Sequence, residues 1–448
     1  MSRSRKYYIV SLGCPKNTVD SESMAVLLER AGYRVASAPE RADLLIVNTC
    51  GFIAPAREES VATLHELIDG RRPGQRVIAA GCYAQRSPDE LIDAVPGLDG
   101  VLGTRHWKDV AALAKRLRSI SSSRPHPPEV CVLPEGSSAV PSEDGVHRVA
   151  IQGNSAYLMI ADGCRRTCAF CAIPLIKGDS VSRPVDAILA DARWLADRGI
   201  QEIILIAQDT TGYGDDLGMR DGLLVLLDRL VDAVPSVPWI RIMYAFPGPV
   251  VGRLMRLMAQ YPQILPYLDI PLQHAHPDVL RRMNRPANVD AMRRMIEDLR
   301  TEVPGIALRT TFLTGFPGET EEEFEALLDF VVDMRFDRMG VFTYSHEIGT
   351  PADRLSDDVS PDVKSERRDR LMEAQQAISL EKNQALVGAT LDVLIEGQGD
   401  GISVGRSYRD APEVDCLVLT ATQLPVGRIV PVRITAALDY DLVGEPPA

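Results

Sequence analysis

Short apolar runs alternate with helical stretches through most of this chain, and this alternation constrains its fold more than any other feature. Runs of about four to eight apolar residues are typical of buried strands, and apolar residues three or four apart are typical of helices. The strand-like runs lie at Tyr7–Leu12, Leu44–Val47, Val77–Ala80, Tyr157–Ile160, Glu202–Ile206, Ile240–Ile242, Leu268–Ile270 and Ala307–Thr311. Helical patterns follow several of them, as at Val19–Arg30, Ala54–Ile68 and Arg183–Arg198. Strands that alternate with helices predict an α/β fold with parallel sheets and helical crossovers.

A Ser- and Pro-rich stretch and a late change of pattern divide the chain into four segments. We expect an N-terminal parallel α/β domain over residues 1–120, a linker over 121–149 and a second α/β region over 150–379. The second region carries strand–helix units over more than 200 residues, which fits a full or partial (β/α) barrel. Residues 380–448 show short strands at 390–396, 416–419 and 428–434 between glycine-containing turns. This tail predicts a small antiparallel β-barrel or a sandwich.

Charge and length exclude several classes of protein. The 448 residues include 49 Lys and Arg against 62 Asp and Glu, a formal net charge of −13. A general nucleic-acid coat needs a phosphate-neutralising surface, so this balance argues against one, while it permits a basic partner. No run approaches the roughly 18 apolar residues of a membrane span, and the run after the basic start is too short for a secretory signal. We therefore expect a cytoplasmic protein, whose eight cysteines are metal ligands or catalytic groups rather than disulfides.

Three of the cysteines stand in one loop directly after a predicted strand. Cys164, Cys168 and Cys171, here called the loop trio, have the spacing C-x3-C-x2-C. Three thiolates in one compact loop can bind three irons of a [4Fe–4S] cluster and leave the fourth iron open to a small molecule. Structural zinc is the alternative, but a closed zinc site needs four ligands, and no fourth lies nearby in the sequence.

Three other cysteines follow the first three apolar runs by two or three residues each. We call Cys14, Cys50 and Cys82 the sheet-edge trio. Because the carboxyl ends of parallel strands meet at one edge of a sheet, we expect these thiols to lie close together. This predicts a second three-cysteine site that also suits an iron–sulfur cluster, and the alternative is three ordinary buried cysteines. We interpret Cys131 and Cys416 as ordinary free thiols.

The loop trio at the opening of a predicted barrel resembles that of the radical S-adenosylmethionine (SAM) superfamily, and the resemblance extends along the chain. Residues 11–17 (Ser-Leu-Gly-Cys-Pro-Lys-Asn), 48–53 (Asn-Thr-Cys-Gly-Phe-Ile) and 81–82 look like the amino-terminal domain of the methylthiotransferases. The tail looks like their TRAM domain. Residues 14–17, 207–210 and 410–415 are most similar to the branch that modifies an aspartate of a ribosomal protein. Cys416 departs from that branch, in which glycine is expected.

The resemblance implies a radical SAM methylthiotransferase that replaces a β-hydrogen of a loop aspartate in ribosomal protein S12 by a methylthio group, using two SAM molecules. It implies a SAM-cleaving [4Fe–4S] cluster on the loop trio and an auxiliary [4Fe–4S] cluster, which carries the sulfur, on the sheet-edge trio. An electron donor, not identified by the sequence, is a further implied partner. A β C–H bond beside a carboxylate is unactivated, so radical chemistry supplied by a cofactor is the chemical requirement.

Polar residues that follow predicted barrel strands are the candidates for holding SAM. Gln208 and Asp209 follow one strand and Gln273 follows another, while Arg309 opens the stretch 309–318, which resembles a glycine-containing segment of the family near SAM. Such groups could bind ribose hydroxyls or the amino and carboxylate groups of SAM. The alternatives are that Gln208 and Gln273 satisfy loop backbone and that Arg309 pairs with a surface acid.

The charge of the tail bears on the substrate class. Residues 380–448 carry five basic and ten acidic side chains. A module that grips tRNA should be basic, whereas one that docks a basic ribosomal protein should be acidic. We therefore expect no direct tRNA binding, and we expect the clustered acids Asp410, Glu413 and Asp415 to dock the substrate. For the tail, the alternative to docking is an acidic surface that only keeps the protein soluble. For the whole protein, the alternatives are a tRNA adenosine methylthiotransferase and a non-enzymatic adaptor that binds zinc at both sites.

Overall fold

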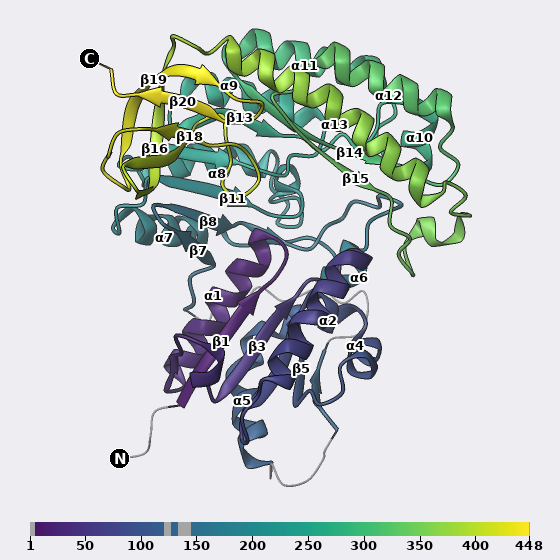
Figure 1. Cartoon of the computed structure of the whole chain (residues 1–448), viewed down its shortest axis with the longest axis vertical. Coiled ribbons are helices and arrows are strands. Elements are labelled where there is room, and N and C mark those ends of the chain that lie inside the picture. The colour runs from purple at the N-terminus through teal and green to yellow at the C-terminus, as the bar shows by residue number, and fades with distance from the viewer. Residues whose placement is uncertain (1–4, 121–126, 133–144, 448) are drawn as a thin grey trace. The chain divides into compact units, whose positions relative to one another are not determined.

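The computed structural model describes residues 5–120, 127–132 and 145–447, so most of the predicted linker at 121–149 lies outside the described residues (Figure 1). The chain divides into two compact units. Unit 1 comprises Met1–Ala150, Leu158–Ala187 and Ser345–Asp353, and unit 2 comprises Ile151–Tyr157, Ile188–Tyr344 and Arg354–Ala448. Both cysteine trios therefore belong to unit 1, whereas the predicted SAM and docking residues belong to unit 2.

Unit 1 contains a six-stranded parallel sheet with the strand order β2-β1-β3-β4-β5-β6. Its strands are β1 (Arg5–Ser11), β2 (Tyr33–Val35), β3 (Leu44–Thr49), β4 (Arg76–Gly81), β5 (Gly100–Gly103) and β6 (Glu129–Cys131). Its helices are α1 (Pro15–Arg30), α2 (Ala54–Asp69), α3 (Cys82–Arg86), α4 (Pro88–Ala94) and α5 (Val110–Ser119), with short 3-10 turns η1 (Pro39–Arg41) and η2 (Thr104–Asp109). The predicted parallel α/β domain is confirmed.

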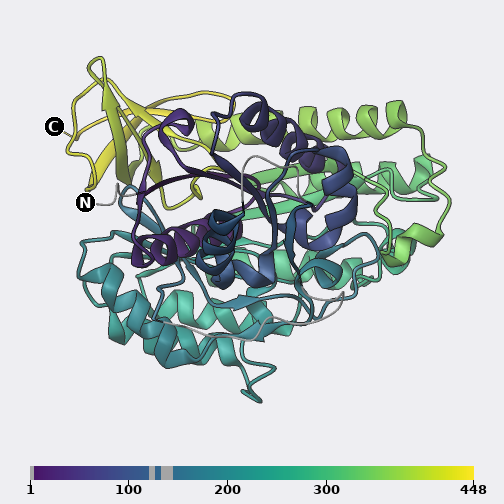
Figure 2. The same ribbon diagram turned by 90° about the horizontal axis from the view of Figure 1, so that it is seen from below.

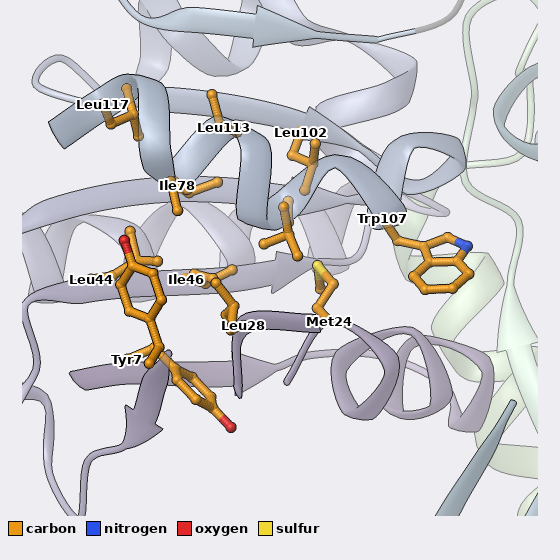
Figure 3. Packing of buried hydrophobic residues seen from close by; sticks show 14 of the residues in the cluster. Tyr7, Met24, Leu28, Leu44, Ile46, Ile78, Leu102, Trp107, Leu113 and Leu117 are labelled. Carbon is orange, nitrogen blue, oxygen red and sulfur yellow. The ribbon is translucent and has the colours of Figure 1, made fainter. Parts of the chain in front are cut away.

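Helices cover both faces of this sheet, so the central strand β3 is buried throughout. Successive side chains of a strand point to opposite faces. Ile46 packs with Leu28 of α1 and Leu113 of α5, as Figure 3 shows, whereas Leu45 packs on the other face with Leu64 of α2. Burial on both faces explains why the strands read as continuous apolar runs rather than as alternating ones.

The first helix begins earlier than the sequence pattern predicted. α1 starts at Pro15, directly after Cys14, and not at Val19. Proline suits the first helical position because its φ is already helical and its missing N–H would have no partner there. Cys14 is consequently the N-cap residue of α1, at the junction between strand and helix.

A second, seven-stranded sheet has the order β15-β14-β13-β12-β11-β8-β7. Its strands are β7 (Val149–Gln152), β8 (Ser155–Met159), β11 (Glu202–Ile206), β12 (Trp239–Ile242), β13 (Ile264–Asp269), β14 (Ala307–Thr314) and β15 (Arg338–Thr343). The division between the units passes through β7 and β8, and the five strands from β11 to β15 are parallel. Because β15 and β7 are the two edges, the sheet is open, which confirms the predicted partial barrel.

Helices connect these strands as the α/β pattern requires. They are α7 (Val185–Ala196), α8 (Gly222–Ala233), α9 (Pro249–Gln260), α10 (Pro277–Arg282), α11 (Val289–Glu302), α12 (Glu321–Met334) and α13 (Pro361–Gln384), with 3-10 turns η3 (Thr210–Gly212) and η4 (Pro351–Arg354). The short elements β9 (Ala161–Asp162), α6 (Ile173–Lys177) and β10 (Val181–Ser182) surround the loop trio. The predicted segment boundary at residue 379 lies within α13. Nowhere in the described ranges does a helix combine the length and apolarity needed to cross a membrane.

The tail forms a closed five-stranded barrel, drawn in yellow in Figures 1 and 2. Its strands are β16 (Thr390–Gly399), β17 (Ile402–Ser407), β18 (Val418–Thr420), β19 (Ile429–Ala437) and β20 (Leu442–Glu445), in the ring order β16-β17-β18-β20-β19. The predicted small antiparallel barrel is confirmed, with one exception among its pairs, because β18 and β20 run parallel. Directions cannot alternate all the way around a ring with an odd number of strands, so one neighbouring pair must be parallel.

Candidate functional site

The sheet-edge trio lies at the carboxyl ends of three neighbouring strands. Cys14 follows β1, Cys50 directly follows β3, and Cys82 directly follows β4. These strands pair side by side in the order β1-β3-β4, with Thr49 opposite Gly81 at the ends of the last two. The parallel-sheet argument therefore places the three thiols at one edge, as the sequence predicted.

Asn17 connects the three loops that carry this trio. Its Nδ2 donates to the carbonyl oxygen of Leu12 at 2.8 Å and to that of Thr49 at 3.1 Å. Its Oδ1 accepts from the Cys82 thiol at 3.4 Å. The sequence singled out the segment 14–17 only through a resemblance and assigned no role to Asn17. A buried amide that can donate twice and accept once explains the residue type at this position.

Close approach of the backbone brings Cys50 against the first loop. Gly13 has φ +87°, and a Cβ built there would lie 2.9 Å from the Cys50 Sγ. Only glycine adopts this left-handed conformation without strain and also leaves room for the thiol. The loop after β1 therefore requires glycine at this position.

Burial shapes the acid–base behaviour of these thiols. Loss of solvent raises the pKa of Cys50 and of Cys82, and the neighbouring Cys14 raises both further. Thiols of this kind stay protonated until a soft cation exchanges for the protons, because the thiolate is the form that binds metal. Three gathered thiols with these properties fit a metal–sulfur group that offers one open coordination position.

The loop trio lies between β9 and α6 and is folded back on itself by backbone hydrogen bonds. The N–H of Cys164 donates to the oxygen of Gly178 at 3.1 Å, and that of Cys171 donates to the oxygen of Cys168 at 3.1 Å. Cys168 is buried, whereas the other two thiols are half-buried. From the segment 345–353 of the same unit, the N–H of Ala352 donates to the oxygen of Ala169. All eight cysteines are described, and all are free of disulfides.

The two trios are neighbours within unit 1. Ala172 follows Cys171 directly, and together with Ile176 it packs in one small buried cluster with Cys82 and Phe52. The helix after the loop trio therefore touches the residue that begins α3 in the sheet-edge trio. Two inorganic groups bound at these cysteines would lie on adjacent elements.

The predicted SAM residues lie at the strand ends of unit 2, with one exception. Gln208 and Asp209 follow β11, and the Asp209 carboxylate accepts from the N–H groups of Thr211 at 3.0 Å and Gly212 at 3.2 Å. Gln273 follows β13 with φ +74°, a left-handed conformation that costs a residue with a side chain about 1–3 kcal/mol. Backbone strain of this kind clusters at functional sites.

Arg309 is the exception. It is the third residue of β14 and not a strand end. Its Nη1 donates to Asp269 at 3.1 Å and its Nε to Asp415 at 3.3 Å. Arg309 therefore pairs with carboxylates, as the alternative expected, but both acids are buried rather than at the surface. A SAM contact through Arg309 stays a prediction.

The tail acids also differ from their predicted role. Asp410 is 1% exposed and accepts from the Nε and Nη2 of Arg338 at 3.0 and 2.6 Å. The side chain of Asp415 is 2% exposed, and it accepts from the Tyr267 hydroxyl at 2.6 Å. The expectation that these two acids dock a partner is wrong, because they neutralise arginines of the large sheet. Glu413 is exposed and accepts from the Tyr157 hydroxyl at 3.2 Å, so docking through it stays a prediction.

Three family models match the chain. Residues 6–103 match the uncharacterized protein family UPF0004, residues 158–331 match the radical SAM superfamily, and residues 387–446 match the TRAM domain. These ranges correspond to the parallel sheet, most of the open barrel and the closed tail barrel.

Curated relatives match over nearly their whole length. The chain is 49% identical over 452 residues to the ribosomal protein uS12 methylthiotransferase RimO of Chloroflexus aurantiacus, covering 98% of this chain and 99% of the relative. It is 47% identical over 463 residues to the protein of the same name from Roseiflexus castenholzii, covering 98% and 96%.

Solved structures share the fold at lower identity. The radical SAM methyltransferase TsrM from Kitasatospora setae, with tryptophan and a SAM analogue bound, has a TM-score of 0.55 at 17% identity, covering 84% of this chain and 89% of that one. The same enzyme with cobalamin and a [4Fe–4S] cluster has a TM-score of 0.52 at 16% identity, covering 90% and 77%. At these identities the likeness shows the fold alone.

Proposed function

The chain belongs to the ribosomal protein uS12 methylthiotransferases, and from that premise we propose that its two cysteine trios hold two separate [4Fe–4S] clusters. As a member of this family it is a radical SAM enzyme that transfers a methylthio group to ribosomal protein uS12. An iron–sulfur cluster and SAM are the cofactors of its radical SAM domain. The proposal concerns which residues serve each cofactor.

The observation that carries the proposal is the grouping of six of the eight cysteines into two trios on adjacent elements of one unit. The loop trio lies inside the radical SAM match, and the sheet-edge trio lies inside the other amino-terminal match. We assign the SAM-cleaving cluster to the loop trio and the auxiliary cluster to the sheet-edge trio. Three ligands for each cluster leave one iron open for SAM or for sulfur.

The residues of the chain bind and position these groups. When bound, the loop-trio cluster and SAM supply the radical that abstracts a β-hydrogen from the substrate aspartate, and the auxiliary cluster holds the sulfur that is transferred. The six cysteines act as thiolates and release their protons when metal binds. Asn17 holds the sheet-edge loops in place through its amide. Gln208, Asp209 and Gln273 are our candidates for SAM contacts at the strand ends.

The charge of the tail supports a proposal for how the substrate binds. The tail carries more acidic than basic side chains, and Glu413 remains exposed after Asp410 and Asp415 pair with arginines. We propose that Glu413 faces the basic substrate, that the enzyme acts in the cytoplasm, and that it binds no tRNA directly. A reduced protein or a chemical reductant must supply the electron for SAM cleavage.

Anaerobic reconstitution tests the assignment of the two clusters. We expect about eight irons and eight sulfides per chain, as two four-iron clusters require, and about four of each after removal of either trio. Cys168→Ala should abolish 5′-deoxyadenosine formation, whereas Cys50→Ala should retain SAM cleavage but give no methylthio product on uS12 by intact mass. Cys131→Ala, outside both trios, is the matched control and should keep both activities.

Two results would contradict the assignment. Tightly bound zinc without iron would support the adaptor alternative at both sites. Normal methylthio transfer by Cys50→Ala would remove the sheet-edge trio from the reaction while leaving the loop trio in place.

A further inference from the structure

A buried cation lies between the two cysteine trios. The side chain of Lys177, the last residue of α6, is 1% exposed. Its Nζ lies 3.1 Å from Asp20 and 3.2 Å from Asp162. Asp20 is also buried, and it accepts from Arg148 at 2.5 Å. These four charged side chains form one ion cluster within unit 1.

Each acid that contacts Lys177 lies on an element next to a cysteine of one trio. Asp20 lies on α1, which begins directly after Cys14. Asp162 ends β9, two residues before Cys164. Lys177 itself ends the helix that follows the loop trio. The ammonium therefore joins the sheet-edge loops to the loop trio through one carboxylate from each side.

The end of α6 also lies beside the sheet-edge trio. α6 and α3 pack together through Ile176 and Cys82, which brings the ammonium into this neighbourhood. Burial alone would lower the pKa of Lys177, but Asp162, Asp20 and Cys82 raise it, so the side chain remains charged.

Packing by itself does not require a charge at this position. A buried ion pair is often no more stabilising than apolar side chains of the same size, because desolvating the charges offsets their attraction. A lysine held by two carboxylates between two thiol sites therefore calls for an electrostatic role. The three cysteine thiolates of the sheet-edge trio give it such a role, since together they carry negative charge that a fixed cation can balance.

We infer that Lys177 is a positioning residue that ties the two cysteine trios together and balances the negative charge of the group bound by Cys14, Cys50 and Cys82. This inference rests on the proposed function, since it assumes a cluster at the sheet-edge trio. A fixed positive charge favours the reduced, more negative form of that cluster. Removing the charge should therefore make the cluster harder to reduce, and removing a neighbouring negative charge should do the reverse.

The test is a potentiometric titration followed by electron paramagnetic resonance. The protein is the full chain in which Cys164, Cys168 and Cys171 are alanine, so that only the sheet-edge cluster contributes. In this background we compare Lys177→Met, Lys177→Arg and Asp162→Asn. Lys364→Met is the matched control, because Lys364 is also buried and paired with an aspartate, Asp357 at 2.6 Å, but lies in unit 2.

The expected shifts have opposite signs. Lys177→Met should lower the ratio of reduced to oxidised cluster at fixed potential about tenfold, which is 59 mV for a one-electron couple. Asp162→Asn should raise this ratio, and Lys177→Arg should leave it close to that of the parent. A merely structural role for Lys177 would not reverse the sign between the lysine and aspartate variants. Lys364→Met should leave the potential unchanged.

The outcomes separate this inference from the proposed function. If the triple-alanine background holds no iron, the sheet-edge assignment itself fails. If the background holds about four irons and neither Lys177→Met nor Asp162→Asn moves the potential, the charge role is overturned and the assignment stands. If Lys177→Met does not retain iron, the Asp162→Asn and Lys177→Arg variants decide, and the absence of a positive shift in Asp162→Asn overturns the inference.

Discussion

Replacing Glu202 by glutamine tests how the tail barrel is held on the large sheet. Glu202 is the first residue of β11 and is fully buried. One carboxylate oxygen accepts from the Arg241 Nε at 2.6 Å, and the other accepts from the Arg406 Nη2 at 2.6 Å and the Ser155 hydroxyl at 2.8 Å. Arg406 lies on β17 of the tail, so this carboxylate links the two sheets of unit 2. Glutamine keeps the shape of the side chain and removes its charge.

Two arguments give similar magnitudes for the stability that Glu202→Gln loses. Removing one partner of a buried ion pair costs about 3–5 kcal/mol. Burial raises the pKa of Glu202, but Arg241 and Arg406 outweigh burial and lower it from 4.5 to about 2. At about 1.4 kcal/mol for each pKa unit, this shift corresponds to about 3 kcal/mol of stability. Arg406 retains Glu396 at 2.6 Å in the variant, so the lower end of the range is expected.

The sign of the pH dependence follows from the lowered pKa. The carboxylate stabilises the fold fully above its unfolded pKa, near 4.5, and this contribution disappears as the pH falls toward 2. The free energy of unfolding of the parent should therefore fall more steeply than that of Glu202→Gln over this window. Below pH 2 the free energies of unfolding of the two proteins should converge.

Urea unfolding monitored by tryptophan fluorescence measures the effect. Trp239 is paired with Glu202 in the register of β11 and β12, so it reports on this part of the sheet. The matched control is Glu445→Gln, which breaks a pair with Arg433 whose side chains are 53% and 55% exposed. Exposed pairs contribute less than about 1 kcal/mol. The reasoning would be refuted if Glu202→Gln lost no more stability than the control. It would also be refuted if the stability of the parent and that of Glu202→Gln changed in parallel with pH.

Two further predictions concern the metal site and the substrate. Gly13→Ala should lower the iron content of the sheet-edge site, because its Cβ would lie 2.9 Å from the Cys50 Sγ. Gly32→Ala is the control, because Gly32 has the same φ of +87° and nothing within 4 Å of its Cβ position. This control should lose only about 1–3 kcal/mol to backbone strain and should keep its iron. Equal iron in both variants would contradict the steric argument. Glu413→Lys should weaken binding of uS12, measured by titration calorimetry, without changing SAM cleavage in the absence of substrate. Glu445→Lys, an exposed charge reversal elsewhere on the tail, should leave uS12 binding unchanged. Equal losses of uS12 affinity in the two variants would argue against docking at Glu413.

The positions of the cysteines could be predicted because they depend on local patterns. Apolar runs identify strands through their length and composition, and parallel strands share one carboxyl edge. A cysteine a few residues after each strand is then placed at that edge by counting along the chain. Counting does not place Arg309 at a strand end, because it lies inside the predicted run Ala307–Thr311 as well as inside β14.

The roles of the tail acids could not be predicted from charge alone. Counting residues distinguishes an acidic segment from a basic one, but not an exposed carboxylate from one that is paired inside. Asp410 and Asp415 meet Arg338 and Arg309 across 72 and 106 residues of chain. No local period encodes such a pairing.

The sequence by itself determined the α/β class, the two trios of cysteines and the small tail barrel, because strand and helix periodicity and motif spacing are properties of neighbouring residues. Only the tertiary structure decided which charges are neutralised and where. Lys177 lies between Asp20 and Asp162 because the path of the chain returns an element 157 residues later to the start of α1. The free energy of a buried charge depends on such neighbours in space, which the order of residues along the chain does not reveal.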